Sequence, residues 1–208
     1  MMLIEQTSVP TAALPVQELK DHLRLGTGFA DDDVQDGVLG TYLRAALAAI
    51  EARTGKILLE RSFAWSLTEW RGGNTQGLPV GPISSVSSVV LTDANDQDTT
   101  VSPDAYHLAA DLHRPLLKAN GSGFPSVPAS GSVTVSFVAG FGPDWNDVPA
   151  DLQQAVCLLA TQFYEFRQEP GGYSGGLPFG VEALIARYRN VRISKGGATS
   201  KTFDLIDA

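Results

Sequence analysis

The chain has 208 residues, of which 43% are hydrophobic, and it carries a net charge of −8 at pH 7. This length and composition fit a folded domain with a sizeable core and exclude an intrinsically disordered chain. The acidic balance argues against a general nucleic-acid binder, because phosphate contacts need clustered Lys and Arg. No apolar run approaches the ~20 residues of a membrane-spanning helix, and the start of the chain lacks the pattern of a secretory signal.

Two helices are expected in the N-terminal part. The first covers residues 15–25, with Leu19 and Leu23 facing inward. Asp31–Asp33 begin the second, which runs to about Thr54. We interpret these aspartates as helix caps and not as a metal site, because consecutive side chains point in divergent directions. The expected buried stripe of the second helix consists of Leu39, Leu43, Ala46, Leu47 and Ile50.

The middle of the chain has the composition of strands. Ile57–Trp70 alternates with Phe63, Trp65 and Leu67 on one face, and Pro82–Thr92 is a second strand region. The clearest alternation places Val133, Val135, Phe137 and Ala139 on one face of a third strand. Turn-rich joints containing Gly and Asn separate these runs, which predicts antiparallel pairing. Whether this β segment closes into a barrel or stays an open sheet is left open.

Two more helices are expected near the C-terminus. Pro149–Arg167 carries an apolar face at three- and four-residue spacing, and a glycine-rich break at 171–176 separates it from a short helix that ends at Arg189. Cys157, the only cysteine, lies inside the apolar helix and is expected to be a small buried hydrophobe. Residues 190–208 have no core of their own and are expected to form an extended or partner-ordered arm.

These elements predict an α+β fold, with a helical core of about four helices, two N-terminal and two C-terminal. An antiparallel β segment is inserted between the two pairs. The predicted organisation is an N-terminal helical half at 1–56, the β segment at 57–140, a C-terminal helical half at 141–189 that packs on the first, and the arm at 190–208.

The chain contains no standard catalytic or phosphate-binding motif. His107, Asp111 and His113 are close in sequence, but their spacing fits no standard metal motif. Residues 93–98 resemble the start of a calcium loop, but Asp98 occupies the position of the required glycine, and a polar β-turn explains them better. We therefore expect no enzyme activity, no catalytic residue, no cofactor and no metal.

Two groups of residues are candidates for contacts with other proteins. Trp70 and Trp145 lie at segment ends near glycines, where a partly exposed side chain suits a subunit contact. Residues 181–201 contain five basic residues and one acidic residue, which suits docking to an acidic partner surface, although a solvated helix end is an equally good reading. The docking candidates combine charged and apolar side chains: Arg187, Tyr188, Arg189, Val191, Arg192, Ile193 and Lys195.

Four segments carry a more specific pattern. Val16–Arg24 reads "hydrophobic-x-E-x-K-x-H-L-R", and Ile50–Gly55 contains "I-E-x-x-T-G". Val148–Arg167 begins "V-P-x-x-L" and ends "F-Y-E-x-R", and Leu177–Arg189 reads "L-P-x-G-V-x-x-L-I-x-x-Y-R". In this order they resemble the head–tail connector (adaptor) proteins of long-tailed double-stranded DNA phages, together with the similar adaptors of phage-derived gene transfer agents. The resemblance covers roughly residues 14–190.

The resemblance implies a structural protein of a virion or phage-like particle, assembled in the bacterial cytoplasm. Such an adaptor forms a homo-oligomeric ring, expected to be a dodecamer, beneath the portal protein. It joins the DNA-filled head to a tail-side neck (stopper) protein, while DNA passes through the channel without sequence-specific binding and no membrane is involved. The β segment is long compared with the all-helical version of the family, so the role of 57–140 is not implied.

Two other classes of function stay open from the residues alone. The first is a non-catalytic module that binds a carbohydrate or small ligand through the β segment, for which an exposed aromatic cleft is the expected sign. The second is a hydrolase built around His107, Asp111 and His113, which would require these side chains to converge.

Overall fold

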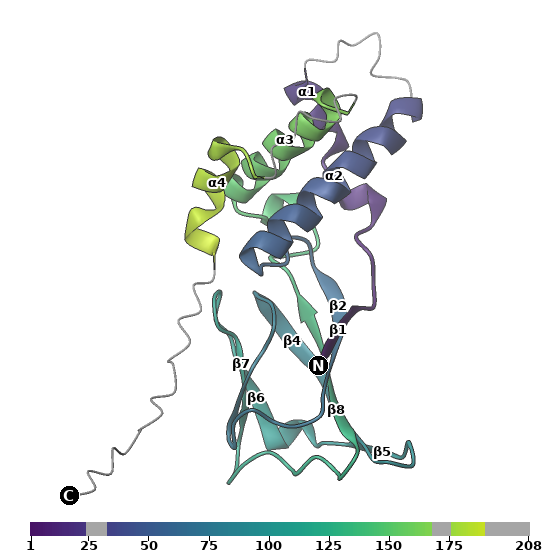
Figure 1. Ribbon diagram of the computed structural model, residues 1–208, viewed down its shortest axis with the longest axis vertical. Helices are drawn as coiled ribbons and strands as arrows, with labels where there is room; N and C mark the ends of the chain where they lie inside the picture. Colours follow the sequence, from purple (N-terminus) through teal and green to yellow (C-terminus); the bar gives the residue numbers. More distant parts are fainter. Residues whose placement is uncertain (24–32, 168–175, 190–208) are drawn as a thin grey trace, which may run out of the picture.

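The computed structural model describes residues 1–23, 33–167 and 176–189. Helices gather at one end of this part of the chain and strands at the other, and the N-terminus lies beside the strands (Figure 1). Helices and antiparallel sheets therefore occupy separate regions, which makes the fold α+β, as the sequence predicts.

The helices come in two pairs from the two ends of the chain. The N-terminal pair is α1 (Val16–His22) and α2 (Asp33–Thr54), and the C-terminal pair is α3 (Ala150–Glu165) and α4 (Phe179–Ile185). The long helices α2 and α3 pack against each other, α4 packs on α3, and α1 contacts both long helices. Short 3₁₀ turns cover Thr11–Ala13, Pro103–Ala105, Trp145–Asp147 and Ala186–Tyr188. Within the described residues, no helix combines the length and apolar character needed to cross a membrane.

The strands form two antiparallel sheets. The larger sheet has the order β1-β2-β8-β4-β5, and the smaller has the order β3-β7-β6. The strands of the larger sheet are β1 (Met2–Glu5), β2 (Arg61–Leu67), β8 (Ser132–Ala139), β4 (Ile83–Thr92) and β5 (Asp98–Thr100). Those of the smaller sheet are β3 (Thr75–Gly77), β7 (Leu116–Ala119) and β6 (Tyr106–Ala109).

Alternation along β2 and β8 buries one face of the larger sheet. Phe63, Trp65 and Leu67 are at most 4% exposed, while the residues between them are half-buried. On β8 the buried positions are Val133, Val135, Phe137 and Ala139, as predicted. Phe63 pairs with Phe137 across the two strands, and their rings stack with centroids 5.8 Å apart. The period of two in the sequence thus fixes which face of the sheet is inside.

Between α2 and α3, the chain enters and leaves the β part at one place. On the way in it passes through Leu58 and Glu60, and on the way out through Phe141 and Gly142. The Phe141 amide donates to the Leu58 carbonyl at 3.1 Å, and the Glu60 amide donates to the Gly142 carbonyl at 2.9 Å. Gly140, directly before Phe141, has φ of +144°, and a Cβ on it would lie 2.4 Å from the backbone of Glu60. Only glycine fits this approach of the two segments.

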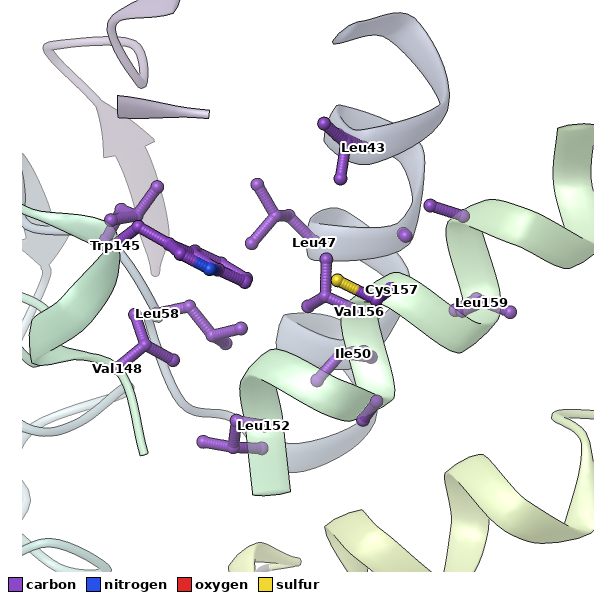
Figure 2. Close-up of a cluster of buried hydrophobic side chains, with 14 of the residues drawn as sticks. Leu43, Leu47, Ile50, Leu58, Trp145, Val148, Leu152, Val156, Cys157 and Leu159 are labelled. Carbon is purple, nitrogen blue, oxygen red and sulfur yellow. The ribbon is translucent and has the colours of Figure 1, made fainter. Parts of the chain in front are cut away.

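Two clusters of buried side chains correspond to the two regions. The helical cluster packs α2 against α3, and it also contains Leu58, Leu59 and Trp145 (Figure 2). The predicted stripe of α2 belongs to it, since Leu39, Leu43, Ala46, Leu47 and Ile50 are all buried. The second cluster lies between the sheets and contains the inward residues of β2 and β8. Each region therefore has a hydrophobic core of its own.

The structure differs from the sequence-based expectation at the N-terminus. Residues 2–5 form the strand β1, which pairs with β2, whereas helices alone were expected before residue 57. Several expected features lie outside the described residues: the end of the first expected helix at 24–25, the capping side chains of Asp31–Asp33, most of the break at 171–176 and the arm at 190–208.

Candidate functional site

The last described turn of the chain is fixed to the start of α3. The Tyr188 hydroxyl donates a hydrogen bond to Oδ1 of Asp151 at 2.8 Å, and Nε of Arg187 lies 2.9 Å from Oδ2 of the same carboxylate. The Arg187 guanidinium also donates to the Tyr188 hydroxyl and stacks 4.7 Å from the centre of its ring. Asp151 is in the first turn of α3, where the helix dipole favours a negative charge.

Protonation supports this arrangement. Burial raises the pKa of the Tyr188 hydroxyl, so the phenol keeps its proton and can donate it to Asp151. The hydrogen bond to Tyr188, reinforced by the Asp151 charge, raises the pKa of Arg187. The three side chains thus form a charged and hydrogen-bonded group that orients the chain as it leaves the helical region.

The predicted docking residues fall into three situations. The Arg187 side chain is 69% exposed and Arg189 is exposed, so both cations face solvent at the end of the described chain. Tyr188 is only 3% exposed and packs in the helical core, so in the single chain it does not offer an anchor to a partner. The remaining candidates, Val191, Arg192, Ile193 and Lys195, lie outside the described residues.

A partly open pocket of ≈ 420 Å³ lies beside this turn. It joins the hairpin tip between β6 and β7 to the helical region, and Arg187 supplies its charged side. The lining residues are Leu112, His113, Phe141, Pro149, Arg187 and Tyr188. Its Arg187 is already neutralised by Asp151. The pocket therefore presents mainly apolar and aromatic surface.

The two candidate tryptophans for subunit contacts differ. Trp145 is 9% exposed and lies in the helical core beside Leu58 and Val148 (Figure 2), so the expectation that it is partly exposed is wrong. Trp70 is half-buried. Its ring stacks on Phe124 at 4.3 Å, and its Nε1 donates to the Pro125 carbonyl at 2.9 Å. Both rings thus have partners within the chain, and their use between subunits stays a prediction.

The polar residues considered for chemistry have structural partners. The Asp111 carboxylate accepts the backbone amides of His113 and Arg114, while the His107 ring pairs with Asn120. These backbone bonds lower the pKa of Asp111 and hold a turn in place. Across the described residues, no group of three His, Cys, Asp or Glu side chains is placed to hold a metal ion.

The suspected calcium loop is a β-turn. Asp93 accepts the backbone amides of Asn95 and Gln97, and these bonds lower the pKa of its carboxylate. Asp96 sits in the turn with φ of +58°, a conformation that Asp tolerates better than most residues. The carboxylate of Asp93 is therefore used by the turn itself, as the sequence predicts.

Sequence reasoning missed the surface of β1. Met1, Met2, Leu3 and Ile4 are 72%, 58%, 37% and 45% exposed, and they make up half of the large hydrophobic side chains that are exposed in the described chain. The signal in the sequence is the run of apolar residues directly before Glu5. This run does not by itself indicate a strand, because four residues are too few to show a period.

Comparisons with solved structures give close matches over nearly the whole chain. A chain in the neck of an empty gene transfer agent particle, determined with C6 symmetry, is 50% identical, with a TM-score of 0.86. A chain in the virion of a native gene transfer agent particle is 49% identical, with a TM-score of 0.84. A chain in the neck of a native particle, determined with C12 symmetry, is 45% identical, with a TM-score of 0.82. Each match covers 94% of this chain and 99% of the other. No protein-family model and no curated protein sequence matches the chain.

Proposed function

Because this chain belongs to the neck proteins of gene transfer agent particles, we propose that it is the head–tail adaptor of such a particle. In this role it forms a ring beneath the portal protein and joins the DNA-filled head to the tail-side neck protein. The observation that carries the proposal is the 50% identity to a neck chain over 94% of this sequence. The order of the four adaptor-like segments in the sequence supports it independently.

We propose a ring of twelve copies. The matched necks were determined with C6 and C12 symmetry, and twelve copies in one ring are compatible with both operators. A cyclic ring repeats the same heterologous contact between neighbours. A modest contact is sufficient in such a ring, because closing it makes every contact depend on the others.

The portal-facing contact is proposed for the basic C-terminal segment. Two observations support this placement: Arg187 and Arg189 face solvent, and the Asp151–Tyr188 hydrogen bond sets the direction of the chain at this point. Arginine side chains suit docking on an acidic surface, because their planar fork can pair with two carboxylate oxygens. Arg192 and Lys195 extend the same basic character along the sequence.

An acidic adaptor fits a channel through which DNA passes. The net charge of −8 disfavours phosphate contacts over most of the chain, so DNA can move past the ring without binding to it. The chain has one cysteine, and it is buried, which suits assembly in the reducing bacterial cytoplasm. The role is structural, and the neck chains that it resembles support a function without catalysis.

The first test is native mass spectrometry of the purified chain, alone and mixed with the portal protein encoded near it. We expect a ring, formed either by the chain alone or on the portal, and its mass gives the copy number. A chain that remains monomeric and ignores the portal would refute the adaptor proposal.

Portal docking is tested separately in pull-downs with the portal protein. A truncation after Tyr188 keeps the Asp151 contact and removes the rest of the basic segment, and we expect it to lose portal binding. Lys118→Glu is the matched control, since Lys118 is a partly exposed basic residue on β7, in the smaller sheet. Undiminished binding by the truncated chain would place the docking site elsewhere.

A further inference from the structure

The two free edges of the larger sheet fit each other. We propose that β1 of one copy adds in parallel to β5 of the next copy, with Met2 beside Asp98, Leu3 beside Thr99 and Ile4 beside Thr100. This inference deepens the proposed ring and rests on it. It assigns to the β part of the fold the contact between neighbouring subunits.

β1 is an exposed apolar edge. All four of its residues are exposed, and three of them, Met2, Leu3 and Ile4, are hydrophobic. In the described chain it is the terminal strand of its sheet, with β2 on one side only. Exposed apolar edge strands invite pairing with another chain, so proteins usually cover them or interrupt them with charges. An edge of this kind is expected to be covered in the assembled particle.

The edge is held in place and does not depend on a partner for its conformation. Glu5, at the end of β1, makes an ion pair with Arg61 through both carboxylate oxygens at 3.1 Å. The next amide, of Gln6, donates to the Ser62 carbonyl at 2.8 Å, and Arg71 contacts the sulfur of Met1 at 3.3 Å. A preformed edge loses little conformational entropy when it binds, which favours its use as an interface.

Within the described residues, the other terminal strand of the same sheet is β5, and its three residues are exposed as well. A cyclic ring needs two different surfaces on every copy, one for each neighbour, because its contacts are heterologous. The sheet order β1-β2-β8-β4-β5 supplies two such surfaces at its two ends. The occupant proposed for the β1 edge is therefore a second copy of this chain.

Strand directions agree with this pairing. All four neighbouring pairs in the sheet are antiparallel, so β1 and β5 run in the same chain direction. A simple repeat of the subunit then brings β1 of one copy alongside β5 of the next in parallel. An antiparallel contact would require one copy to be turned over relative to its neighbour, which the small rotation between neighbours in a ring of twelve does not allow.

The backbone groups that point outward from β1 and β5 also fit the proposed register. The Gln6 amide bonds to β2. In an antiparallel ladder the backbone groups of alternate residues point to the same side, so those of Met2 and Ile4 also point toward β2 and those of Leu3 point away from it. On β5, the bonds from Val101 to Val89 and from Asp93 to Gln97 leave Asp98 and Thr100 directed outward. In a parallel ladder one residue bonds to two residues that flank its neighbour. Leu3 can therefore bond to Asp98 and Thr100.

The same register keeps the faces of the sheet continuous. Leu3 lies opposite Trp65 on the inner face, and Thr99 lies opposite the buried Leu91 on that same face. Ile4 and Thr100 both lie on the outer face, since Ile4 pairs with Ala64 and Thr100 pairs with Val90, both half-buried. In this register the inner face of the sheet in one copy continues into the inner face of the next copy, and the outer face into the outer face.

Charge complementarity supports the register at one end. Because Met2 is placed beside Asp98, Met1 is placed beside Gln97, at the acidic turn that contains Asp96. Arg71, which contacts Met1, then lies near Asp96 and Asp98 of the next copy. The Glu5 carboxylate is paired with Arg61, which reduces the repulsion that it adds at this interface.

The test is disulfide cross-linking in assembled rings. The double variant Ile4→Cys/Thr100→Cys places the two thiols on one face at adjacent positions, where neighbouring parallel strands ~4.8 Å apart satisfy disulfide geometry. Under mild oxidation we expect a ladder of covalent oligomers on a denaturing gel without reductant. Ile4→Cys/Thr99→Cys is the matched control, because its thiols point to opposite faces, and we expect no ladder from it.

The single variants distinguish the modes of pairing. Either Ile4→Cys or Thr100→Cys alone gives no cross-link in a head-to-tail contact, and both also control for Cys157. Dimers from Ile4→Cys alone would mean that β1 pairs with β1, which overturns the inference. A ring seen by native mass spectrometry without a ladder from Ile4→Cys/Thr100→Cys also overturns it while the adaptor proposal stands. A chain that forms no ring, alone or with portal, refutes the adaptor proposal itself.

Discussion

Arg61 and Glu51 form a buried ion pair where α2 meets β2. Nη2 of Arg61 lies 2.6 Å and 2.5 Å from the two carboxylate oxygens of Glu51. Nη1 of the same guanidinium holds Glu5 of β1, and the Arg61 side chain is only 8% exposed. One arginine therefore connects the helical region, the sheet and its N-terminal edge strand.

Removing Arg61 is expected to be costly. In Arg61→Met the carboxylate of Glu51 loses its cationic partner and keeps only the Leu58 amide, and breaking a buried pair in this way typically costs ~3–5 kcal/mol. Urea unfolding measures the loss. Arg53→Gln is the control, because Arg53 and Glu182 are 48% and 41% exposed and such a pair contributes about 0–1 kcal/mol. Equal losses in the two variants would contradict a central role for Arg61.

Glu51 gives the folded protein a specific pH dependence. Burial raises the pKa of this carboxyl above 4.5, and the attraction of Arg61 only partly offsets the effect. The native chain therefore keeps this proton to higher pH than the unfolded chain does. The contribution of Glu51 to the unfolding free energy falls as pH rises above 4.5, by at most about 1.4 kcal/mol per pH unit.

The variant Glu51→Gln isolates this contribution, because the contributions of the other carboxyl groups to the unfolding free energy cancel when the parent and the variant are compared. We expect the unfolding free energy of the parent minus that of Glu51→Gln to decrease as pH rises through the range just above 4.5. Urea unfolding at several pH values measures it. A difference that stays flat or increases over this range would show that the folded-state pKa is not raised.

Cys157 should be unreactive until the protein unfolds. Its side chain lies in the helical core at 9% exposure (Figure 2), and burial raises the pKa of its thiol. We expect a chromogenic disulfide reagent to react slowly with the native chain at neutral pH and quickly in denaturant. Thr100→Cys provides an exposed thiol for comparison. Equal native rates for Cys157 and the introduced thiol would contradict the packing described.

Tyr188 should stabilise the C-terminal helices through both its ring and its hydroxyl. Tyr188→Phe keeps the ring and loses the hydroxyl's bonds to Asp151 and Arg187, which is expected to cost about 1.5–3 kcal/mol because both partners are charged. Tyr188→Ala also removes a buried ring and is expected to cost about 3–5 kcal/mol. Thermal unfolding measures both. Phe179→Ala is the control, since Phe179 is 87% exposed, and a loss there comparable to that of Tyr188→Ala would contradict the assignment.

Strong periodicity made most of the fold predictable from the sequence. The alternation of Val133, Val135 and Phe137 and the helical spacing of Leu39, Leu43 and Ile50 each identify a face, and the structure buries both sets. The strand β1 was not predicted, because its four residues form a strand through pairing with β2 and through the Glu5–Arg61 ion pair. Such long-range causes leave no local pattern.

The candidate site was predictable in part. The resemblance to adaptors, including those of gene transfer agents, is confirmed by the neck chains that match. Trp145 was expected to be partly exposed because it lies at a segment end near glycines, but it packs in the helical core beside Val148 and Leu58, the latter distant in sequence. Tyr188 was expected to face a partner, but it packs in the helical core, and its hydroxyl bonds to Asp151, 37 positions earlier. The domain boundaries and the docking role of the arm stay predictions.

Apart from β1, which joins the sheet from the N-terminus, the β part is a module between α2 and α3 whose ends meet at the paired segments Leu58–Glu60 and Phe141–Gly142. Its two chain ends lie within hydrogen-bonding distance of each other, so a short turn could join them without moving α2 or α3. Leu58 and Leu59 belong to the helical core and would remain in place. The size of this module can therefore change in evolution, by loss or gain of whole hairpins, while the helical framework of the neck stays the same.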